Sequence, residues 1–263
     1  MPNEIQTQFG AVAATYVESK PHARGEDLPI LVEAIDAKGA EIVLDLGTAV
    51  GHTAFAVAPH VAEVVGIDLT QEMLDLASRL AAERGIRNVR FLHGDVMKLP
   101  FPDRSFDVVT SRYSAHHYRE PLRVAREVAR VLRPGGRFLL ADTIAPEDPA
   151  LDTFVNAIEY LRDRSHVRDH RILEWREMLD SVGLVSEVVH TWNVTLDFTT
   201  WVERMRTPSQ AVGMLRTLFQ QAPEAARATF QIQNRGDLSF CLLGAMLRAE
   251  RGPAPLTLGD RAC

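Results

Sequence analysis

Short apolar runs and amphipathic segments alternate along the first 145 residues of the chain. Runs that suit buried strands occupy residues 41–44, 61–67, 89–93, 105–110 and 137–141. Segments with apolar side chains at helical spacing occupy residues 27–37, 70–83 and 121–132. Thr70 is expected to cap the second of these helices, and Gly85 to end it. The alternation predicts a parallel sheet with helices on both faces.

The hydrophobic pattern changes after the fifth apolar run. Pro146 and Pro149 interrupt the chain, and helices are expected beyond them, at residues 150–163 and 171–182. Two further apolar runs, at residues 184–194 and 238–247, are expected to be strands. The mostly helical residues 198–230 lie between these two runs, so we expect a helical insertion before the last strand.

A strand, a tight glycine turn and a helix follow one another near residue 47. Gly47 and Gly51 bracket the turn, an arrangement by which a doubly wound sheet brings its backbone close to a nucleotide-like ligand. Asp68 ends the next apolar run about 20 residues further on, where an acid can accept both hydroxyls of a ribose. An NAD-linked dehydrogenase also uses such an acid, but residues 47–52 read Gly-Thr-Ala-Val-Gly-His, which does not fit its Gly-x-Gly-x-x-Gly fingerprint.

Two further motifs extend this pattern. One is the stretch from Gly94 to Asp107, Gly-Asp-Val-Met-Lys-Leu-Pro-Phe-Pro-Asp-Arg-Ser-Phe-Asp, and the other is Leu132-Arg133-Pro134-Gly135-Gly136. Together the motifs resemble the class I S-adenosylmethionine (SAM)-dependent methyltransferases over roughly residues 9–190. The resemblance is greatest to the small-molecule branch that includes the ubiquinone and menaquinone biosynthesis methyltransferases.

The resemblance implies an α/β fold with a Rossmann-like sheet of seven strands. The sheet would be mostly parallel, with one antiparallel edge strand, helices on both faces and a helical insertion before the last strand. Residues 1–251 would form a single domain, followed by a loose tail at 252–263. Within the domain we expect an N-terminal helical cap at 1–37, a SAM-binding core at 38–145, substrate-side helices and a strand at 146–235, and the last strand at 236–251.

The resemblance also implies SAM as the cofactor and S-adenosylhomocysteine as its product. Gly47 and Gly51 would permit close backbone approach. Asp45 would orient the ammonium group, directly or through water, or would simply bond loop amides. Asp68 would hold the ribose and Asp95 the adenine amino group. The adenine would lie between apolar side chains that could equally be core residues: Leu69, Met73 and Val96.

Two residues near the cofactor leave more than one interpretation open. The turn of the family is usually Gly-x-Gly-x-Gly, and its centre here is Ala49, whose Cβ would narrow the backbone approach or be absorbed by a small loop shift. Arg112 is placed with the cofactor-binding residues, and an acidic substrate or a nearby carboxylate is its alternative partner.

The residues after the fourth strand usually face the transferring methyl group in this family, and here they include His116 and His117. A neutral imidazole can deprotonate a phenol, an enol or an activated carbon. Because adjacent side chains point in different directions, at most one of the two is expected to be the base, and His117 is favoured. The Asn/Asp-Pro-Pro-Tyr motif of many amine methyltransferases is absent, which favours an oxygen or carbon acceptor.

Two polar segments are expected to reach the substrate. Tyr16 and His22 belong to an N-terminal region that closes over SAM in related enzymes. His166 and Arg168 belong to the charged stretch at residues 162–170, which could receive an anionic substrate. A solvated charged face is the alternative interpretation of that stretch.

Composition restricts the partners further. The 263 residues carry a net charge of −6, which gives no general attraction to phosphate backbones or anionic membranes. Two cysteines without metal-ligand spacing predict neither a disulfide framework nor a metal site. No apolar run approaches the roughly 20 residues of a membrane span, and no signal peptide is evident, so a cytoplasmic protein is expected, as a monomer or a homodimer.

These features predict a methyltransferase that acts on oxygen or carbon of a small organic molecule, with no nucleic-acid or membrane partner. Two alternatives remain open at this point. One is an enzyme that uses SAM in a non-methylating cyclisation or rearrangement. The other is a non-catalytic SAM-binding scaffold protein.

Overall fold

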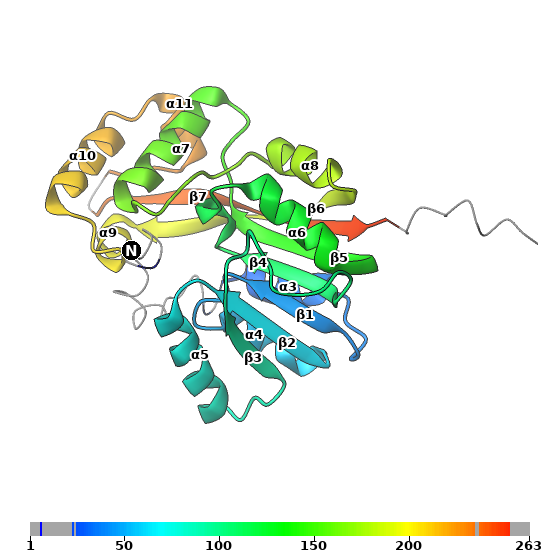
Figure 1. Cartoon of the computed structure of the whole chain (residues 1–263). Helices are drawn as coiled ribbons and strands as arrows, with labels where there is room; N and C mark the ends of the chain where they lie inside the picture. Colours follow the sequence, from blue (N-terminus) through cyan, green and yellow to red (C-terminus); the bar gives the residue numbers. More distant parts are fainter. Residues whose placement is uncertain (1–5, 7–22, 24, 235–236, 253–263) are drawn as a thin grey trace, which may run out of the picture.

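A seven-stranded sheet organises the chain. The computed structural model describes residues 6, 23, 25–234 and 237–252, and its strands follow the order β3-β2-β1-β4-β5-β7-β6 (Figure 1). The strands are β1 (Ile42–Leu46), β2 (Glu63–Asp68), β3 (Val89–His93), β4 (Phe106–Arg112), β5 (Leu132–Thr143), β6 (Leu184–Asp197) and β7 (Ser239–Arg251). Strands β1 to β5 pair in parallel, which confirms the predicted fold class.

The antiparallel strand is β7, which pairs with β5 on one side and with β6 on the other. It therefore lies one place inside the edge of the sheet, and β6 is outermost. Since β7 is antiparallel to both neighbours, β6 runs in the same direction as β5. The carboxyl end of β6 consequently lies at the same edge of the sheet as the carboxyl ends of β1 and β4.

The helices agree with the amphipathic segments to within a few residues. They are α3 (Asp27–Ala34), α4 (His52–Val57), α5 (Gln71–Glu83), α6 (Pro121–Val131), α7 (Pro149–Arg162), α8 (Ile172–Asp180), α9 (Phe198–Arg204), α10 (Ser209–Gln220) and α11 (Glu224–Thr229), with short 3-10 turns η1 (Ala58–His60) and η2 (Ala115–His117). One detail of the expectation was wrong: the Thr70 side chain makes no capping hydrogen bond. The backbone N–H of Thr70 is instead bound by the Asp68 carboxylate.

Helices cover both faces of the sheet because its central strands are apolar on both sides. On one face α6 and α8 contribute Val128 and Leu179 to a buried core with Leu44 of β1. On the other face α3 and α4 contribute Leu31 and Val57 to a separate core. The sheet is thus the middle layer of three, as the alternating pattern predicted.

A third core joins the helical insertion to α7. Helices α7, α9, α10 and α11 pack around Trp201, Phe219 and Phe240, and the Phe219 and Phe240 rings lie 4.7 Å apart between centroids. Leu196, at the carboxyl end of β6, joins the same core. These helices gather beyond one end of β6 and β7 (Figure 1), so the insertion lies over the carboxyl edge of the sheet.

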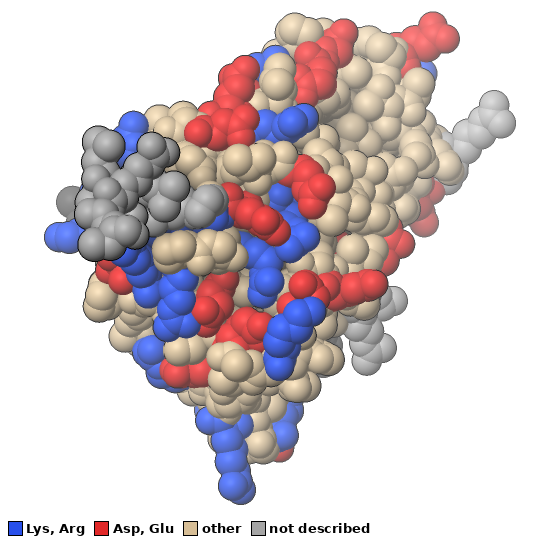
Figure 2. All heavy atoms as spheres, turned by 90° about the vertical axis from the view of Figure 1, so that its right-hand side faces the viewer, with Lys and Arg blue, Asp and Glu red and all other residues tan. Residues whose placement is uncertain are grey.

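Charges of both signs are interspersed on the surface. Figure 2 shows Lys and Arg beside Asp and Glu over the face it presents. Within the described residues, no helix is long and apolar enough to cross a membrane. The expected N-terminal cap and C-terminal tail lie largely outside the described ranges, so the domain bounds remain predictions, as do the expected partners and location.

Candidate functional site

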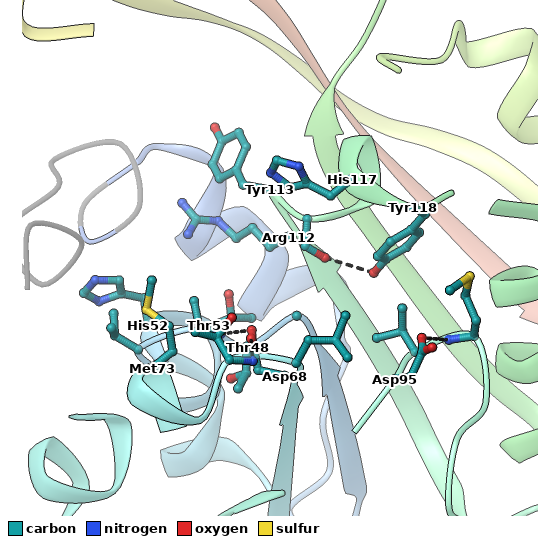
Figure 3. A pocket seen from close by; sticks show the side chains of 18 of the residues that line it. Thr48, His52, Thr53, Asp68, Met73, Asp95, Arg112, Tyr113, His117 and Tyr118 are labelled. Atoms are coloured by element: carbon teal, nitrogen blue, oxygen red, sulfur yellow. Dashed lines mark hydrogen bonds between the residues drawn. The ribbon is translucent and has the colours of Figure 1, made fainter. Parts of the chain in front are cut away.

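The candidate site is a cavity at the carboxyl ends of the parallel strands. In a doubly wound sheet the strand order reverses between two neighbours, here β1 and β4, and ligands bind in the crevice outside that point. A cavity of about 290 Å³ occupies this place. Figure 3 shows Thr48 and Asp68 below it, and Arg112, Tyr113 and His117 above it.

The glycine turn forms the floor of this cavity in an unusual backbone conformation. Gly47, Ala49 and Gly51 all have positive φ angles, of 62°, 47° and 89°. A Cβ on Gly47 would lie 2.5 Å from Ser114 Oγ, and one on Gly51 would lie 2.8 Å from the Phe55 ring. Both glycines are therefore required by the packing as well as by φ, and Gly47 also lines the cavity.

Ala49 adopts the conformation that a central glycine would favour. Its N–H donates to Asp68 Oδ2 at 2.9 Å, so the turn is bound to the end of β2 despite the extra methyl group. The left-handed region costs an L residue roughly 1–2 kcal/mol. Alanine in place of the usual central glycine therefore leaves the turn intact, at the cost of local backbone strain at residue 49.

Replacing Ala49 with glycine is expected to raise the free energy of unfolding by less than about 1 kcal/mol, because relief of strain is offset by about 0.5–1 kcal/mol of chain entropy. Urea denaturation measures this change. Ala54→Gly, in the buried face of α4, is the matched control and should lower stability by about 1 kcal/mol. Equal losses in the two variants would contradict the strain at Ala49.

Asp68 lines the cavity, and its carboxylate is bound by two backbone amides. Oδ2 accepts the Ala49 N–H and Oδ1 accepts the Thr70 N–H at 2.8 Å. Each carboxylate oxygen has a second lone pair, so both can also accept a ribose hydroxyl. Burial raises the pKa of Asp68, and the two amide bonds oppose this rise.

Asp95 lies to one side of the same cavity, after β3. Its Oδ1 accepts the Met97 N–H at 2.8 Å (Figure 3). Three apolar side chains predicted around the adenine also line the cavity: Leu69, Met73 and Val96. Carboxylates at two points with apolar walls between them fit a nucleoside with polar hydroxyl and amino donors, which is the chemistry that SAM presents.

Asp45 does not line the cavity. It is buried under the turn, where the Thr110 hydroxyl donates to its Oδ1 at 2.7 Å. Burial raises the pKa of Asp45 to about 6. A role in orienting the SAM ammonium group remains a prediction.

Arg112 has a carboxylate partner, one of the alternatives the sequence left open. Its Nε and Nη2 lie 2.5 and 3.0 Å from the two oxygens of Asp27, and the two side chains are 2% and 1% exposed. The pair binds the end of β4 to α3. Arg112 also lines the cavity, so its predicted contact with the cofactor is geometrically available.

His116 and His117 follow β4 in the turn η2, and their rings make different contacts. His116 Nδ1 lies 2.7 Å from Asp142 Oδ1, whereas His117 Nδ1 lies 3.0 Å from the Ser165 carbonyl oxygen. A carbonyl oxygen can only accept, so His117 Nδ1 is the protonated nitrogen and Nε2 has the lone pair. His117 lines the cavity of about 290 Å³ that is predicted to hold the cofactor, here called the cofactor cavity, and His116 does not.

The two rings also differ in charge. Burial alone would lower the pKa of His116, but the Asp142 carboxylate raises it to about 9. Burial and the neighbouring charge of His116 lower the pKa of His117 to about 4. At neutral pH His116 therefore retains its proton and His117 is neutral, which favours His117 as the base.

The charged stretch at residues 162–170 is not a solvated face, so that interpretation was wrong. Asp163, Ser165, His166 and Asp169 are buried, because the segment packs against η2. The Val167 and Arg168 N–H groups both donate to the His116 carbonyl oxygen.

His166 and Arg168 take part in this packing. The His166 ring lies 3.1 Å from Asn156 Oδ1, and Arg168 Nη2 lies 2.6 Å from Asp152. Neither residue lines the cavities at the carboxyl edge. Their contact with substrate remains a prediction. Tyr16 and His22 lie outside the described residues.

The sequence did not single out several residues of the cavity wall. The segment after β4 contributes Tyr113, Ser114 and Tyr118. Tyr118 Oη lies 2.9 Å from the hydroxyls of Ser111 and Ser114. These residues follow the strand whose end usually faces the methyl group in this family, and that position was the signal available in the sequence. Residue type alone does not distinguish them from core residues.

A second, smaller cavity adjoins the first. It measures about 60 Å³ and shares Tyr113 and His117 with the cofactor cavity. Its other walls come from η2, β5, α7, α9, β6 and β7, through His116, Thr143, Glu159, Arg162, Val194, Leu196, Arg204 and Leu242. His117 therefore lies on the boundary between the two cavities. Among the described residues no His, Cys, Asp or Glu cluster is arranged to hold a metal ion, and the expectation of no metal remains a prediction.

The chain is similar to known methyltransferases in sequence and in structure. Residues 44–140 match a family described as a methyltransferase domain. A Bacillus subtilis protein described as the uncharacterised methyltransferase YcgJ is 43% identical over 251 residues, covering 94% of this chain and 98% of the relative. Its crystal structure superposes with a TM-score of 0.84 at 41% identity, covering 86% of this chain and 97% of the other. A Listeria monocytogenes demethylmenaquinone methyltransferase is 38% identical over 94 residues, 36% of this chain and 40% of that protein.

Proposed function

Because this chain belongs to the class I SAM-dependent methyltransferases, we propose that it methylates an oxygen or carbon atom of a small organic molecule and releases S-adenosylhomocysteine. The observation that supports this is the position of His117. A neutral imidazole on the boundary between the cofactor cavity and a second cavity can contact an acceptor held in the second cavity.

Bound SAM would supply an electrophilic methyl group, and the protein must then position an acceptor with an available electron pair. His117 Nε2 would accept a hydrogen bond from the acceptor hydroxyl or acidic C–H, and would take that proton as the new bond to the methyl group forms. Its low pKa makes the ring a weak base, so orientation of the acceptor is a large part of this role. Asp68 and Asp95 would hold the nucleoside during the transfer.

The dimensions of the site support a small acceptor. The second cavity measures only about 60 Å³, and residues of β6, β7, α7 and α9 line part of it. A macromolecular substrate would need an open surface beside the methyl group instead. The absence of the amine motif after β4 supports oxygen or carbon as the acceptor atom.

The experiment that tests this function is detection of S-adenosylhomocysteine by mass spectrometry after incubation with SAM and a panel of phenols, enols and organic acids. A methylated product formed together with S-adenosylhomocysteine is the expected result. Conversion of an acceptor with SAM left intact would instead favour the non-methylating enzyme. Tight SAM binding with no conversion in any panel would favour the scaffold protein.

Cofactor binding itself is tested with Asp68→Ala. We expect SAM affinity to fall by about 10- to 100-fold, because hydrogen bonds to a charged acceptor contribute about 1.5–3 kcal/mol and about 1.4 kcal/mol is tenfold. Calorimetric titration with SAM, and with NAD for comparison, measures this. Asp75→Ala removes an exposed carboxylate of α5 and should leave affinity unchanged. Unaltered SAM affinity in Asp68→Ala would contradict the ribose assignment.

A further inference from the structure

The second cavity brings together side chains from segments far apart in the sequence. Glu159 and Arg162 come from the last turns of α7, and Arg204 from the last turn of α9. The strands β6 and β7 contribute Val194, Leu196 and Leu242. One part of its wall is therefore charged and another is apolar.

Positive charge predominates in the charged part. Arg162 and Arg204 are guanidinium groups, and His116 retains its proton because Asp142 raises its pKa to about 9. The single carboxylate in the wall is Glu159, whose Oε2 lies 2.9 Å from Arg162 Nη1. The wall itself thus has three cationic groups and one carboxylate. Asp142, which does not line the cavity but pairs with His116 at 2.7 Å, reduces the excess to one positive charge.

Neighbouring residues hold the Arg162 side chain in place, but not all of its N–H donors have hydrogen-bond partners among the described residues. Its side chain is 10% exposed, and its guanidinium carbon lies 5.2 Å from the centroid of the Trp201 ring. Its buried Nε has no hydrogen-bond partner among the described residues. This Nε and the Glu159 Oε1 atom of the same wall are both buried without a partner in the described part of the chain, so neither atom is open to a ligand in the cavity. The planar guanidinium group as a whole matches a carboxylate in geometry. The arrangement suits a ligand that brings a carboxylate.

The size and position of the cavity restrict that ligand. A volume of about 60 Å³ accommodates a carboxylate with a short carbon chain against the apolar wall. The two cavities meet at His117 and Tyr113. A molecule anchored at the arginines would therefore point its other end toward the cofactor cavity.

We propose that the second cavity anchors the methyl acceptor and that the acceptor is a small carboxylic acid, whose carboxylate is bound by Arg162 and Arg204. The acceptor atom then lies beyond the carboxylate, beside His117. This inference rests on the proposed methyltransferase function, which it extends by naming the class of substrate.

The test is an NMR titration of the full chain with propionate, with propionamide as the neutral isostere and inorganic phosphate as a second anion. Each titration is run with and without saturating S-adenosylhomocysteine. We expect propionate to bind at least about 10-fold more tightly than propionamide, and to lose about 10- to 100-fold in Arg162→Gln and Arg204→Gln, as hydrogen bonds to charged groups predict. Affinity for S-adenosylhomocysteine should stay within about twofold.

Matched variants separate binding from folding. Arg164→Gln removes the same charge from an exposed arginine two residues beyond Arg162 and should bind propionate as the wild type does. Arg162→Lys keeps the charge and should retain more binding than Arg162→Gln. Thermal denaturation of each variant shows whether it is folded.

The outcomes distinguish this inference from the function on which it rests. Equal binding of propionate and propionamide, tighter binding of phosphate, or unchanged binding in both glutamine variants would overturn the carboxylate site while methyl transfer still stands. Arginine-dependent propionate binding by a protein that binds no S-adenosylhomocysteine would support the anion site and contradict the methyltransferase function.

Discussion

Asp142→Asn is expected to lower the free energy of unfolding by about 3–5 kcal/mol at pH 6, the cost of removing one partner from a buried ion pair. Asp142 is 3% exposed and His116 is 17% exposed, with 2.7 Å between Asp142 Oδ1 and His116 Nδ1. The same carboxylate accepts the N–H groups of Ala115 and Thr143. Asparagine keeps the shape but leaves a charged imidazole without its counter-charge.

The size of this loss should depend on pH. The pKa of His116 is raised from 6.5 to about 9 on folding, so its proton stabilises the fold fully below pH 6.5. That stabilisation is lost as pH rises through 9. The stability difference between wild type and Asp142→Asn should therefore shrink by about 3 kcal/mol between pH 6 and 9.5, since one pKa unit is about 1.4 kcal/mol.

Urea denaturation at pH 6, 7.5 and 9.5 measures both effects. Asp180→Asn, at an exposed position at the end of α8, is the control and should change stability by less than about 0.5 kcal/mol at each pH. A constant difference between wild type and Asp142→Asn over this range would show that His116 is not the protonated partner.

His117→Gln is expected to lower kcat by about 10²-fold, the lower end of the usual contribution of a positioned acid–base group, because the low pKa of His117 makes it a weak base. Glutamine can still hydrogen-bond the acceptor but cannot take its proton. The affinity for SAM should stay within about threefold, because His117 touches only one end of the cofactor cavity. The fall therefore belongs to the transfer step rather than to cofactor binding.

Initial rates with an accepted substrate and calorimetric SAM titration separate these quantities. His60→Gln replaces an exposed histidine at the end of η1 and should leave kcat unchanged. In the wild type, kcat should fall as pH drops toward 4, where His117 gains a proton. If kcat in His117→Gln stays within about threefold of the wild type, His117 does not act as the base.

The strand and helix pattern was readable from the sequence because it depends on neighbours along the chain. The buried run before Asp45 and the helical spacing of residues 70–83 predicted β1 and α5 to within a residue or two. Asp68 and Asp95 both line one cavity, as expected of strand ends that meet at one edge of a parallel sheet, and their contacts with the cofactor remain predictions. The expected capping by the Thr70 side chain is not made, which is a matter of side-chain orientation that the sequence does not specify.

The sequence by itself determined the fold class and the family, both of which follow from local periodicity and motif order. Only the tertiary structure decided the charge states of His116 and His117, because these depend on burial and on Asp142, 26 positions from His116. It also decided that Arg112 pairs with Asp27, 85 positions away, and that Arg162 and Arg204 share one cavity. Electrostatic interactions act through space, and the spacing of charges along a chain does not specify which of them meet.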